Sequence, residues 1–455
     1  MNQCECQNKI TQVPNDTMEL YWDIRQDLDK AIYRGTYDED PESCSPPNQA
    51  MIWLSSGDMR DGGDLYQRYI MALFYLRLNG TKWDQEQLWL TEDSECMWFG
   101  IQCNGKFRLN SVALDTNNVH GSLPTELQYL ERVRQLSITR NHLTGTIPPE
   151  IFNMPNLQSL QLYANQLRGS IPSEVQNAEL LRVLRLENNL FFGRLVTEIG
   201  ALTNMEEFSV GFNEFWRYIP TEIGLLTNMR WLVLEDNRFS GTLHTEFGRL
   251  TNLEYFLMSN NLMTGQLPTE MAALGELQEW RIAHTGIGGV FPTEYAALTK
   301  LHRLEMGFNN FAGTFMTEFG KMTGLSWLAM NNNDISGTIP SELGNLVNMT
   351  RLLLADCLLT GNVPTELGRM TQLQNFMLDK NHLKGAVPND ICQLRNRMLD
   401  VFVADCPVDR IDMNGKKIEG LQCGVPSCCT FCRPTDKDIR GNGAERPCRP
   451  GTGNC

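Results

Sequence analysis

The sequence predicts an α/β repeat solenoid, in which short parallel strands stack coil upon coil. Three observations support this fold class. A 24-residue period runs through the middle of the chain without insertion or deletion. Apolar residues alternate early in each period, as in LQSLQL at 157–162, which is typical of a strand with one buried face. Twelve of the fourteen cysteines lie before residue 104 or after residue 405, where disulfides would close the two ends.

The period is defined by an asparagine in the pattern L-x-L-x-x-N-x-L-x-G-x-I-P, and we call its place in each repeat the ladder position. Asparagine fills ten of the twelve ladder positions, and Thr285 and Cys357 fill the other two. Glycine stands four residues later in eleven repeats, Arg217 being the exception. An acidic residue stands nine residues later in all twelve. The ladder positions are 117, 141, 165, 189, 213, 237, 261, 285, 309, 333, 357 and 381.

Each recurring residue has a physical reason in a solenoid. The asparagine turns inward, where its amide pairs with backbone groups of neighbouring coils that would otherwise be buried without partners. Glycine permits a bend, and the Ile-Pro pair begins an extended return. The Thr/Ser-Glu pair that follows predicts a short helical turn, with the hydroxyl as its N-cap and the carboxylate near its positive end. Cation binding by the stacked acids is the alternative, but helix initiation accounts for all twelve.

Composition and charge narrow the compartment and the partners. The net charge of −15 repels a phosphate backbone, so we expect no nucleic acid partner. No run of about 18 apolar residues occurs, and the first residues lack the layout of a signal peptide. The cysteine-rich ends predict an oxidising compartment, so we expect an extracellular or cell-surface location, with any signal or membrane anchor outside this chain. Glycosylation sequons stand at Asn15, Asn79 and Asn348.

The repeat L-x-x-L-x-x-L-x-L-x-x-N-x-L-x-G-x-I-P-x-E-x-G-x-L resembles that of the plant-type leucine-rich repeat family over residues 109–395. The family carries an N-terminal cap ending in C-x-W-x-G-V-x-C, which the chain matches as CMWFGIQC at 96–103. The resemblance implies a disulfide between Cys96 and Cys103. It also implies a right-handed leucine-rich-repeat superhelix, with parallel β-strands on the concave face and disulfide-stabilised caps. A zinc site is the alternative for this cysteine pair, although no histidine lies near it in sequence.

These patterns divide the chain into five regions. They are an N-terminal extension with one helix (1–63), the N-terminal cap (64–108), twelve repeats (109–395), a cysteine-rich C-terminal cap (396–432) and a flexible tail (433–455). Within the extension, the acidic, proline-broken stretch YDEDPESCSPPN favours a loop.

We expect a disulfide knot to close the second cap. The cysteines expected in it are Cys406, Cys423, Cys428, Cys429 and Cys432. A redox C-x-x-C motif and a zinc ribbon are the alternatives. The first would require a βαβ context and the second another knuckle, and the sequence has neither.

The sequence carries no motif that pairs a nucleophile with a base, cradles a phosphate or ligates a metal in known spacing. We therefore expect neither an enzyme nor a cofactor. What remains is the strand surface, whose exposed positions stand six, four and two residues before each ladder position. The candidate ligand-binding residues in these three columns are Tyr163, Arg185, Glu187, Trp231, Val233, Tyr255, Leu257, Glu279, Arg281, Arg303, Glu305, Trp327 and Arg351.

These columns bring exposed aromatic side chains among arginines, a composition typical of binding hot spots. Mutual pairing of the charges, with Trp327 stacked on arginine for stability, is the alternative interpretation. The resemblance implies extracellular recognition, as in receptor ectodomains, of a peptide, glycan or protein on the concave face. The other hypotheses are a secreted inhibitor of an extracellular hydrolase, similar to polygalacturonase-inhibiting proteins, and a structural wall or matrix protein.

Overall fold

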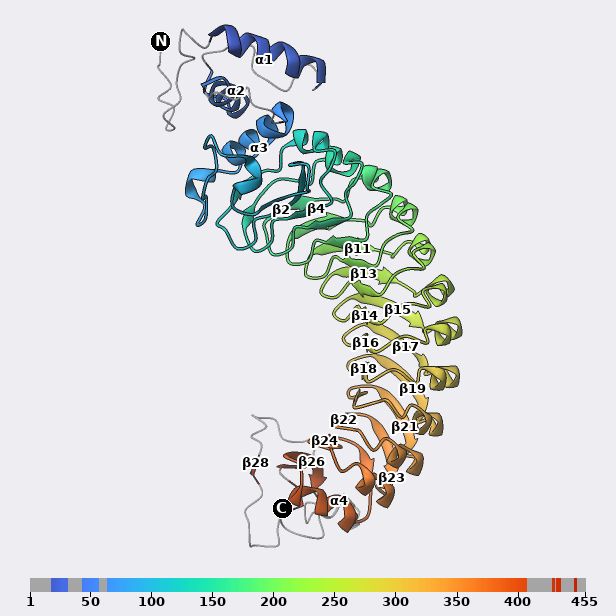
Figure 1. The fold of residues 1–455 in the computed structure, drawn as a ribbon. Coiled ribbons are helices and arrows are strands. Elements are labelled where there is room, and N and C mark those ends of the chain that lie inside the picture. Colours follow the sequence, from blue (N-terminus) through green and yellow to red (C-terminus); the bar gives the residue numbers. More distant parts are fainter. Residues whose placement is uncertain are drawn as a thin grey trace. The chain divides into compact units, whose positions relative to one another are not determined.

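The computed structural model describes residues 18–31, 43–56, 64–406, 428–429, 431–434 and 446–447. The chain forms two compact units, Met1–Trp216 and Arg217–Cys455, and each is described by itself. Figure 1 labels their main helices and strands. Within the described residues, no helix is long and apolar enough to cross a membrane.

The first unit begins with three helices, α1 (Met18–Ala31), α2 (Pro46–Ser56) and α3 (Leu65–Arg77). The expectation of a single helix before residue 64 is wrong, because the structure has a second one, α2. This helix begins within the stretch YDEDPESCSPPN, which was predicted to be a loop. Two prolines open this helix, where their missing N–H groups cost no intrahelical bond, and an apolar run then buries it. Tyr21 of α1 donates a hydrogen bond of 2.7 Å to Asn48 Oδ1 of α2.

The cysteine-bracketed stretch at 96–103 forms the lid of the first unit. Cys96 and Cys103 are joined by a disulfide, as the resemblance implies. Trp98 between them is buried. Gly100 has φ of +79°, and a Cβ there would lie 2.4 Å from the carbonyl oxygen of Ala113, so only glycine fits. The short helices of this cap are η1 (Gly80–Lys82) and η2 (Glu95–Met97). Its strand β1 (Ile101–Cys103) pairs antiparallel with the first repeat strand, β2 (Leu109–Ala113).

Each repeat then contributes one short strand to a parallel sheet. In the first unit these strands are β2 (Leu109–Ala113), β4 (Gln135–Ser137), β6 (Ser159–Gln161), β8 (Val183–Arg185) and β10 (Glu207–Ser209). In the second they are β12 (Trp231–Val233), β14 (Tyr255–Leu257), β16 (Glu279–Arg281), β18 (Arg303–Glu305), β20 (Trp327–Ala329), β22 (Arg351–Leu353), β24 (Asn375–Met377) and β26 (Val401–Cys406). The register between neighbouring strands of this sheet is one full repeat, so that Trp231 lies beside Tyr255 and Glu279 beside Arg303.

A second set of strands lies after the ladder positions. They are β3 (His120–Gly121), β5 (His142–Leu143), β7 (Arg168–Gly169), β9 (Leu190–Gly193), β11 (Glu214–Arg217), β13 (Arg238–Gly241), β15 (Leu262–Gln266), β17 (Gly286–Val290), β19 (Asn310–Thr314), β21 (Asp334–Thr338), β23 (Leu358–Gly361) and β25 (His382–Leu383). In the second unit, Figure 1 shows these strands between the first sheet and a row of short helices.

The ladder asparagines pair with the backbone of adjacent coils, as predicted. Asn189 Nδ2 donates to the carbonyl oxygens of Leu162 (2.9 Å) and Leu186 (3.1 Å), and its Oδ1 accepts from the N–H of Leu167 (3.0 Å). At one ladder position a free, buried thiol, Cys357, replaces the amide. These bonds satisfy backbone groups that no strand partner reaches.

The short helices begin differently from the prediction. Their bounds are η3 (Thr125–Tyr129), η4 (Pro149–Asn153), η5 (Ser173–Asn177), η6 (Thr197–Ala201), η7 (Thr221–Leu225), η8 (Thr245–Arg249), η9 (Thr269–Ala273), η10 (Thr293–Ala297), η11 (Thr317–Lys321), η12 (Ser341–Asn345) and η13 (Thr365–Arg369). The hydroxyl does not cap the helix, because Thr197 already lies inside η6 and Val196 is the N-cap. Thr197 instead donates to Glu198 Oε2 (3.1 Å), and the same contact recurs in other repeats.

The last coil ends in α4 (Asn389–Gln393), η14 (Leu394–Asn396) and β26. Asp405 of β26 stands 24 residues after Asn381 and takes over the ladder there, accepting from the N–H groups of Lys380 (2.8 Å) and Asn381 (3.0 Å). Burial raises the pKa of Asp405, and these two hydrogen bonds oppose the rise.

Cys428 is disulfide-bonded, as expected for the second cap, and its partner is Cys392 of α4, which was not among the cysteines expected there. Cys429 is also disulfide-bonded. Cys406 and Cys432 lie in β26 and in β27 (Phe431–Pro434), which pair in parallel, and Cys423 lies outside the described residues.

The predicted flexible tail also needs a correction at four residues. Arg433 and Pro434 lie at the end of β27. Arg446–Pro447 form β28, which pairs antiparallel with β27. The other residues of the tail after 434 lie outside the described part of the chain.

Candidate ligand-binding face

The candidate site lies on the first sheet of the second unit. We call it the inner strand face, made by residues six, four and two positions before each ladder position in strands β12 to β24. The alternate residues, such as Leu232 and Phe256, are fully buried in the core of the coils. Side chains of an extended strand point to opposite faces in turn, so the residues between the buried ones face outward.

An aromatic patch stands at the start of this face, formed by Trp231, Val233, Tyr255 and Leu257. The rings of Trp231 and Tyr255 lie 4.1 Å apart between centroids, at an interplanar angle of 33°. Trp231 is 42% exposed, and the other three are half-buried. A group of adjacent, exposed apolar side chains marks an interaction site more often than a single exposed apolar side chain does.

A charge cluster of Glu279, Arg281, Arg303 and Glu305 follows the patch. Arg281 Nε lies 2.5 Å from Glu279 Oε1 on its own strand and 3.9 Å from Glu305 Oε2 on the next. Arg303 repeats this arrangement, with Nη2 2.5 Å from Glu305 Oε1 and Nε 3.4 Å from Glu279 Oε1. The expected pairing across strands is present, and pairing along each strand is the shorter contact.

Trp327 is held between two guanidinium groups beyond the charge cluster. The Cζ atoms of Arg303 and Arg351 lie 3.8 Å and 4.0 Å from the ring centroid. Within the described residues Arg351 makes no ion pair, and Trp327 Nε1 is buried without a hydrogen-bond partner. Stacking therefore fixes this ring between its neighbours, as the stability interpretation predicts.

Glu235 belongs to this face, although the sequence analysis did not include it among the candidate residues. It stands two residues after Val233 in the column that also holds Glu187. Burial raises the pKa of the Glu235 carboxyl, and the attraction of Arg281 opposes the rise. In the sequence, only the position of Glu235 two residues before a ladder position marks it as a residue of this face. That position does not reveal whether its carboxylate forms an ion pair or a hydrogen bond.

A second feature was also missed, the exposed ring pair of His284 and Phe308. Their rings stack 4.1 Å apart. Each precedes a ladder position and has a left-handed backbone, with φ of 52° and 58°. The residue before every ladder position shares this left-handed conformation. None of these residues is glycine, so the sequence does not indicate the conformation.

The remaining candidates, Tyr163, Arg185 and Glu187, lie in the first unit. Arg185 Nη2 is 2.8 Å from Glu187 Oε1, and its Cζ lies 4.9 Å from the centre of the Tyr163 ring. The two charges balance each other, and Glu187 Oε2 is buried without a hydrogen-bond partner. Of the predicted sequon residues, Asn79 and Asn348 are exposed, and Asn15 lies outside the described residues.

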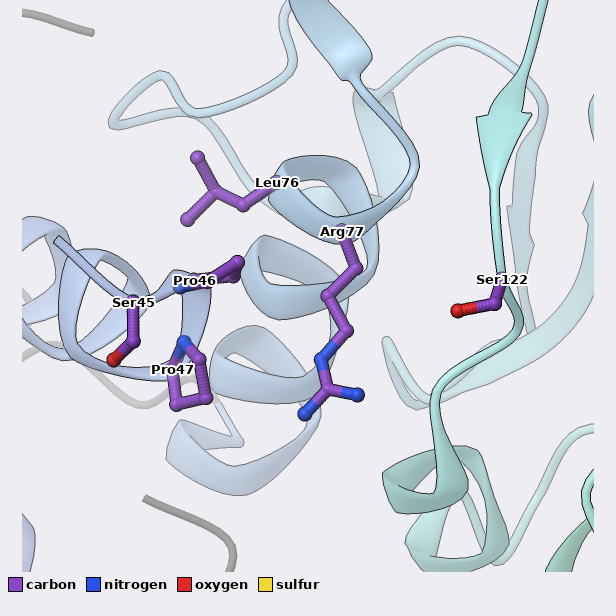
Figure 2. A pocket seen from close by; sticks show the side chains of 6 residues that line it. All are labelled: Ser45, Pro46, Pro47, Leu76, Arg77 and Ser122. Atoms are coloured by element: carbon purple, nitrogen blue, oxygen red, sulfur yellow. The ribbon is translucent and has the colours of Figure 1, made fainter. Parts of the chain in front are cut away.

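A separate hollow of about 550 Å³ lies in the first unit, at the ends of α2 and α3 (Figure 2). Its lining residues are Ser45, Pro46, Pro47, Leu76, Arg77 and Ser122. Arg77 Nη2 lies 3.2 Å from Glu126 Oε1, a buried carboxylate, so the charge in the lining is already paired. The described part of the chain contains no group of three or more His, Cys, Asp or Glu that could hold a metal ion.

Two family models match the chain, both described as leucine rich repeat, over residues 131–191 and 324–346. The chain therefore contains leucine rich repeats over these residues. The resemblance to leucine-rich repeats and the solenoid fold predicted from the sequence are thus confirmed. No curated protein sequence matches the chain.

Solved structures share the fold. The leucine-rich repeat ectodomain of the Arabidopsis receptor kinase HAESA, in complex with an N-terminally extended IDA peptide hormone, is 28% identical with a TM-score of 0.60, covering 64% of this chain and 52% of that one. The PEPR1–AtPEP1 complex is 24% identical with a TM-score of 0.63, covering 76% and 54%. A plant ice-binding protein is 22% identical with a TM-score of 0.51, covering 71% and 89%. The chain thus spans about half the length of the two receptor chains.

Proposed function

We propose that this leucine-rich repeat protein is an extracellular recognition module that binds a peptide or protein segment on the inner strand face of its second unit. The observation that carries the proposal is the aromatic patch beside the charge cluster. Exposed aromatic side chains on a rigid support bind with little loss of conformational entropy. The backbone beneath them is held by register pairing and by the ladder amides, so the face is preformed.

The charge cluster supports recognition of a chain with polar groups rather than of a purely apolar surface. Its two arginines and two glutamates balance one another, so they need no counter-charge from a ligand. Their remaining donor and acceptor positions are available to the backbone and side chains of a bound segment. The HAESA ectodomain, which shares the fold, was solved with a peptide hormone, and this supports a peptide as the class of ligand.

The extracellular location rests on the disulfides. Cys96–Cys103 and Cys392–Cys428 require an oxidising compartment to form and persist. In such a compartment the exposed Asn79 and Asn348 would be glycosylation acceptors. Removal of N-linked glycans from the secreted protein, followed by mass measurement of the two peptides, tests this part of the proposal.

The test of binding uses a displayed library of random twelve-residue peptides, selected on the purified chain. We expect selected peptides to lose at least about 30-fold in affinity for a Trp231→Ala, Tyr255→Ala double variant, since a hot spot contributes about 2 kcal/mol or more. The matched control is Leu262→Ala, Val290→Ala, which removes exposed apolar side chains from β15 and β17. Selected peptides that bind both double variants equally well, or a glycan array that binds where no peptide does, would overturn the proposal.

A further inference from the structure

Glu235 is placed in line with the aromatic patch. In an extended chain, residues two apart share a face and stand about 6.6 Å apart, so Trp231, Val233 and Glu235 form one row about 13 Å long. The N–H of Leu234 donates to the carbonyl oxygen of Leu257 (2.7 Å), so the pairing with the next strand continues past the end of β12. The row therefore runs from an exposed indole, across an aliphatic side chain, to a carboxylate.

The carboxylate at the end of this row has no partner among the described residues. Arg281, whose charge attracts this carboxylate, already lies 2.5 Å from Glu279 and 3.9 Å from Glu305. The neighbouring Asp236 accepts from Asn260 Nδ2 (3.0 Å). A half-buried carboxylate without a donor is unfavourable, and an arriving cation would relieve that cost.

The net charge around Glu235 is negative, which favours binding of a cation. Glu235 and Asp236 add two negative charges beside a cluster whose own charges cancel. An anionic group of a ligand is therefore repelled from this end of the face. A metal ion is not favoured either, because no group of three ligating side chains occurs in the described chain.

We propose that Glu235, Trp231, Val233, Tyr255 and Leu257 form a subsite for a basic side chain of the bound peptide. The apolar stem of an arginine or lysine would lie on Val233 and Leu257, and its charged head would meet Glu235. An apolar neighbour in the peptide would cover the ring pair of Trp231 and Tyr255. The subsite rests on the proposed function and adds the chemistry of one ligand residue to it.

The experiment uses the same displayed library and two single variants of the full chain. Glu235→Gln removes the charge at almost constant shape. Glu246→Gln is the control, because it removes an equal charge from the same repeat, within the short helix η8 rather than on the inner strand face. Selected peptides are synthesised with each arginine and with citrulline in its place, which keeps the shape but removes the charge.

We expect arginine and lysine to be enriched in the selected peptides. Citrulline is expected to weaken binding to the parent chain and to Glu246→Gln about 10-fold or more, and to leave binding to Glu235→Gln unchanged, since a charge-assisted hydrogen bond is lost only where its partner exists. Peptides that depend on Trp231 and Tyr255 but bind equally with citrulline would overturn the subsite and leave the proposed function standing. Peptides whose affinity is the same for the parent chain and for every inner-face variant would overturn both the subsite and the proposed function.

Discussion

Replacement of the ladder asparagine Asn189 by alanine tests how the solenoid is held together. The amide makes contacts with three carbonyl oxygens and one N–H group. The carbonyl oxygens are shared. That of Leu162 also accepts from Asn165 (3.1 Å), and that of Leu186 also accepts from Asn213 (3.1 Å). The third, of Glu187, also accepts from the N–H of Ala164 (2.9 Å).

The expected loss follows from this sharing. After Asn189→Ala each of the three carbonyl oxygens keeps one donor, and only the N–H of Leu167 loses its acceptor. An orphaned buried N–H costs about 1–3 kcal/mol, whereas weakening shared carbonyl bonds adds little. We therefore expect the free energy of unfolding to fall by about 2–3 kcal/mol, well below what four independent bonds would suggest.

The measurement is urea unfolding of the full chain followed by tryptophan fluorescence, with hydrogen exchange to locate the change. Amide exchange is expected to accelerate around Leu167 and in the coils on either side of Asn189. Asn204→Ala is the control, since Asn204 is exposed and makes a single bond of 2.9 Å to the carbonyl oxygen of Glu179. A loss no larger than that of the control, or one above about 6 kcal/mol, would refute the sharing of carbonyl acceptors.

Three further predictions follow from the same geometry. Cys357→Asn is expected to raise the free energy of unfolding in urea by about 1 kcal/mol. The thiol makes a long contact of 3.4 Å with the carbonyl oxygen of Met330, whereas an amide would both donate and accept hydrogen bonds. A destabilised variant would contradict this. Cys392→Ser is expected to cost about 4 kcal/mol, because its disulfide closes a loop across 36 residues, and a change below 1 kcal/mol would contradict that. Burial raises the pKa of Glu235 above 4.5, so its ionised form is penalised in the folded state at pH 7. Glu235→Gln is therefore expected to unfold at higher temperature than the parent at pH 7, with the difference vanishing below pH 4.5; an equal gap at both pH values would contradict it.

The interior of each repeat could be predicted from its sequence. A 24-residue coil must satisfy its buried backbone groups, and an inward amide does so at the same place in every turn. The strict period also fixes which outward side chains are neighbours. The columns of exposed positions therefore already place Trp231 beside Tyr255 and Glu279 beside Arg303, one repeat apart, as the structure shows.

The starts of the short helices show where local reasoning ends. A threonine before a glutamate is a common helix start, yet Thr197 lies one residue inside η6, because the preceding residue already has an extended backbone and acts as the cap. A difference of one residue decides whether a hydroxyl can reach the helix N–H groups. Sequence patterns do not resolve boundaries at that precision.

The sequence by itself determined the repeat, the ladder and the columns of the inner strand face, because these depend on a period that strand spacing turns directly into neighbours. The tertiary structure decided what depends on distances between separate elements. It paired Cys392 of α4 with Cys428, and it let Glu279 and Glu305 share Arg281 so that Glu235 was left without a cation. Disulfides and ion pairs choose among several partners by a few ångströms, and that choice is made only when the coils are packed.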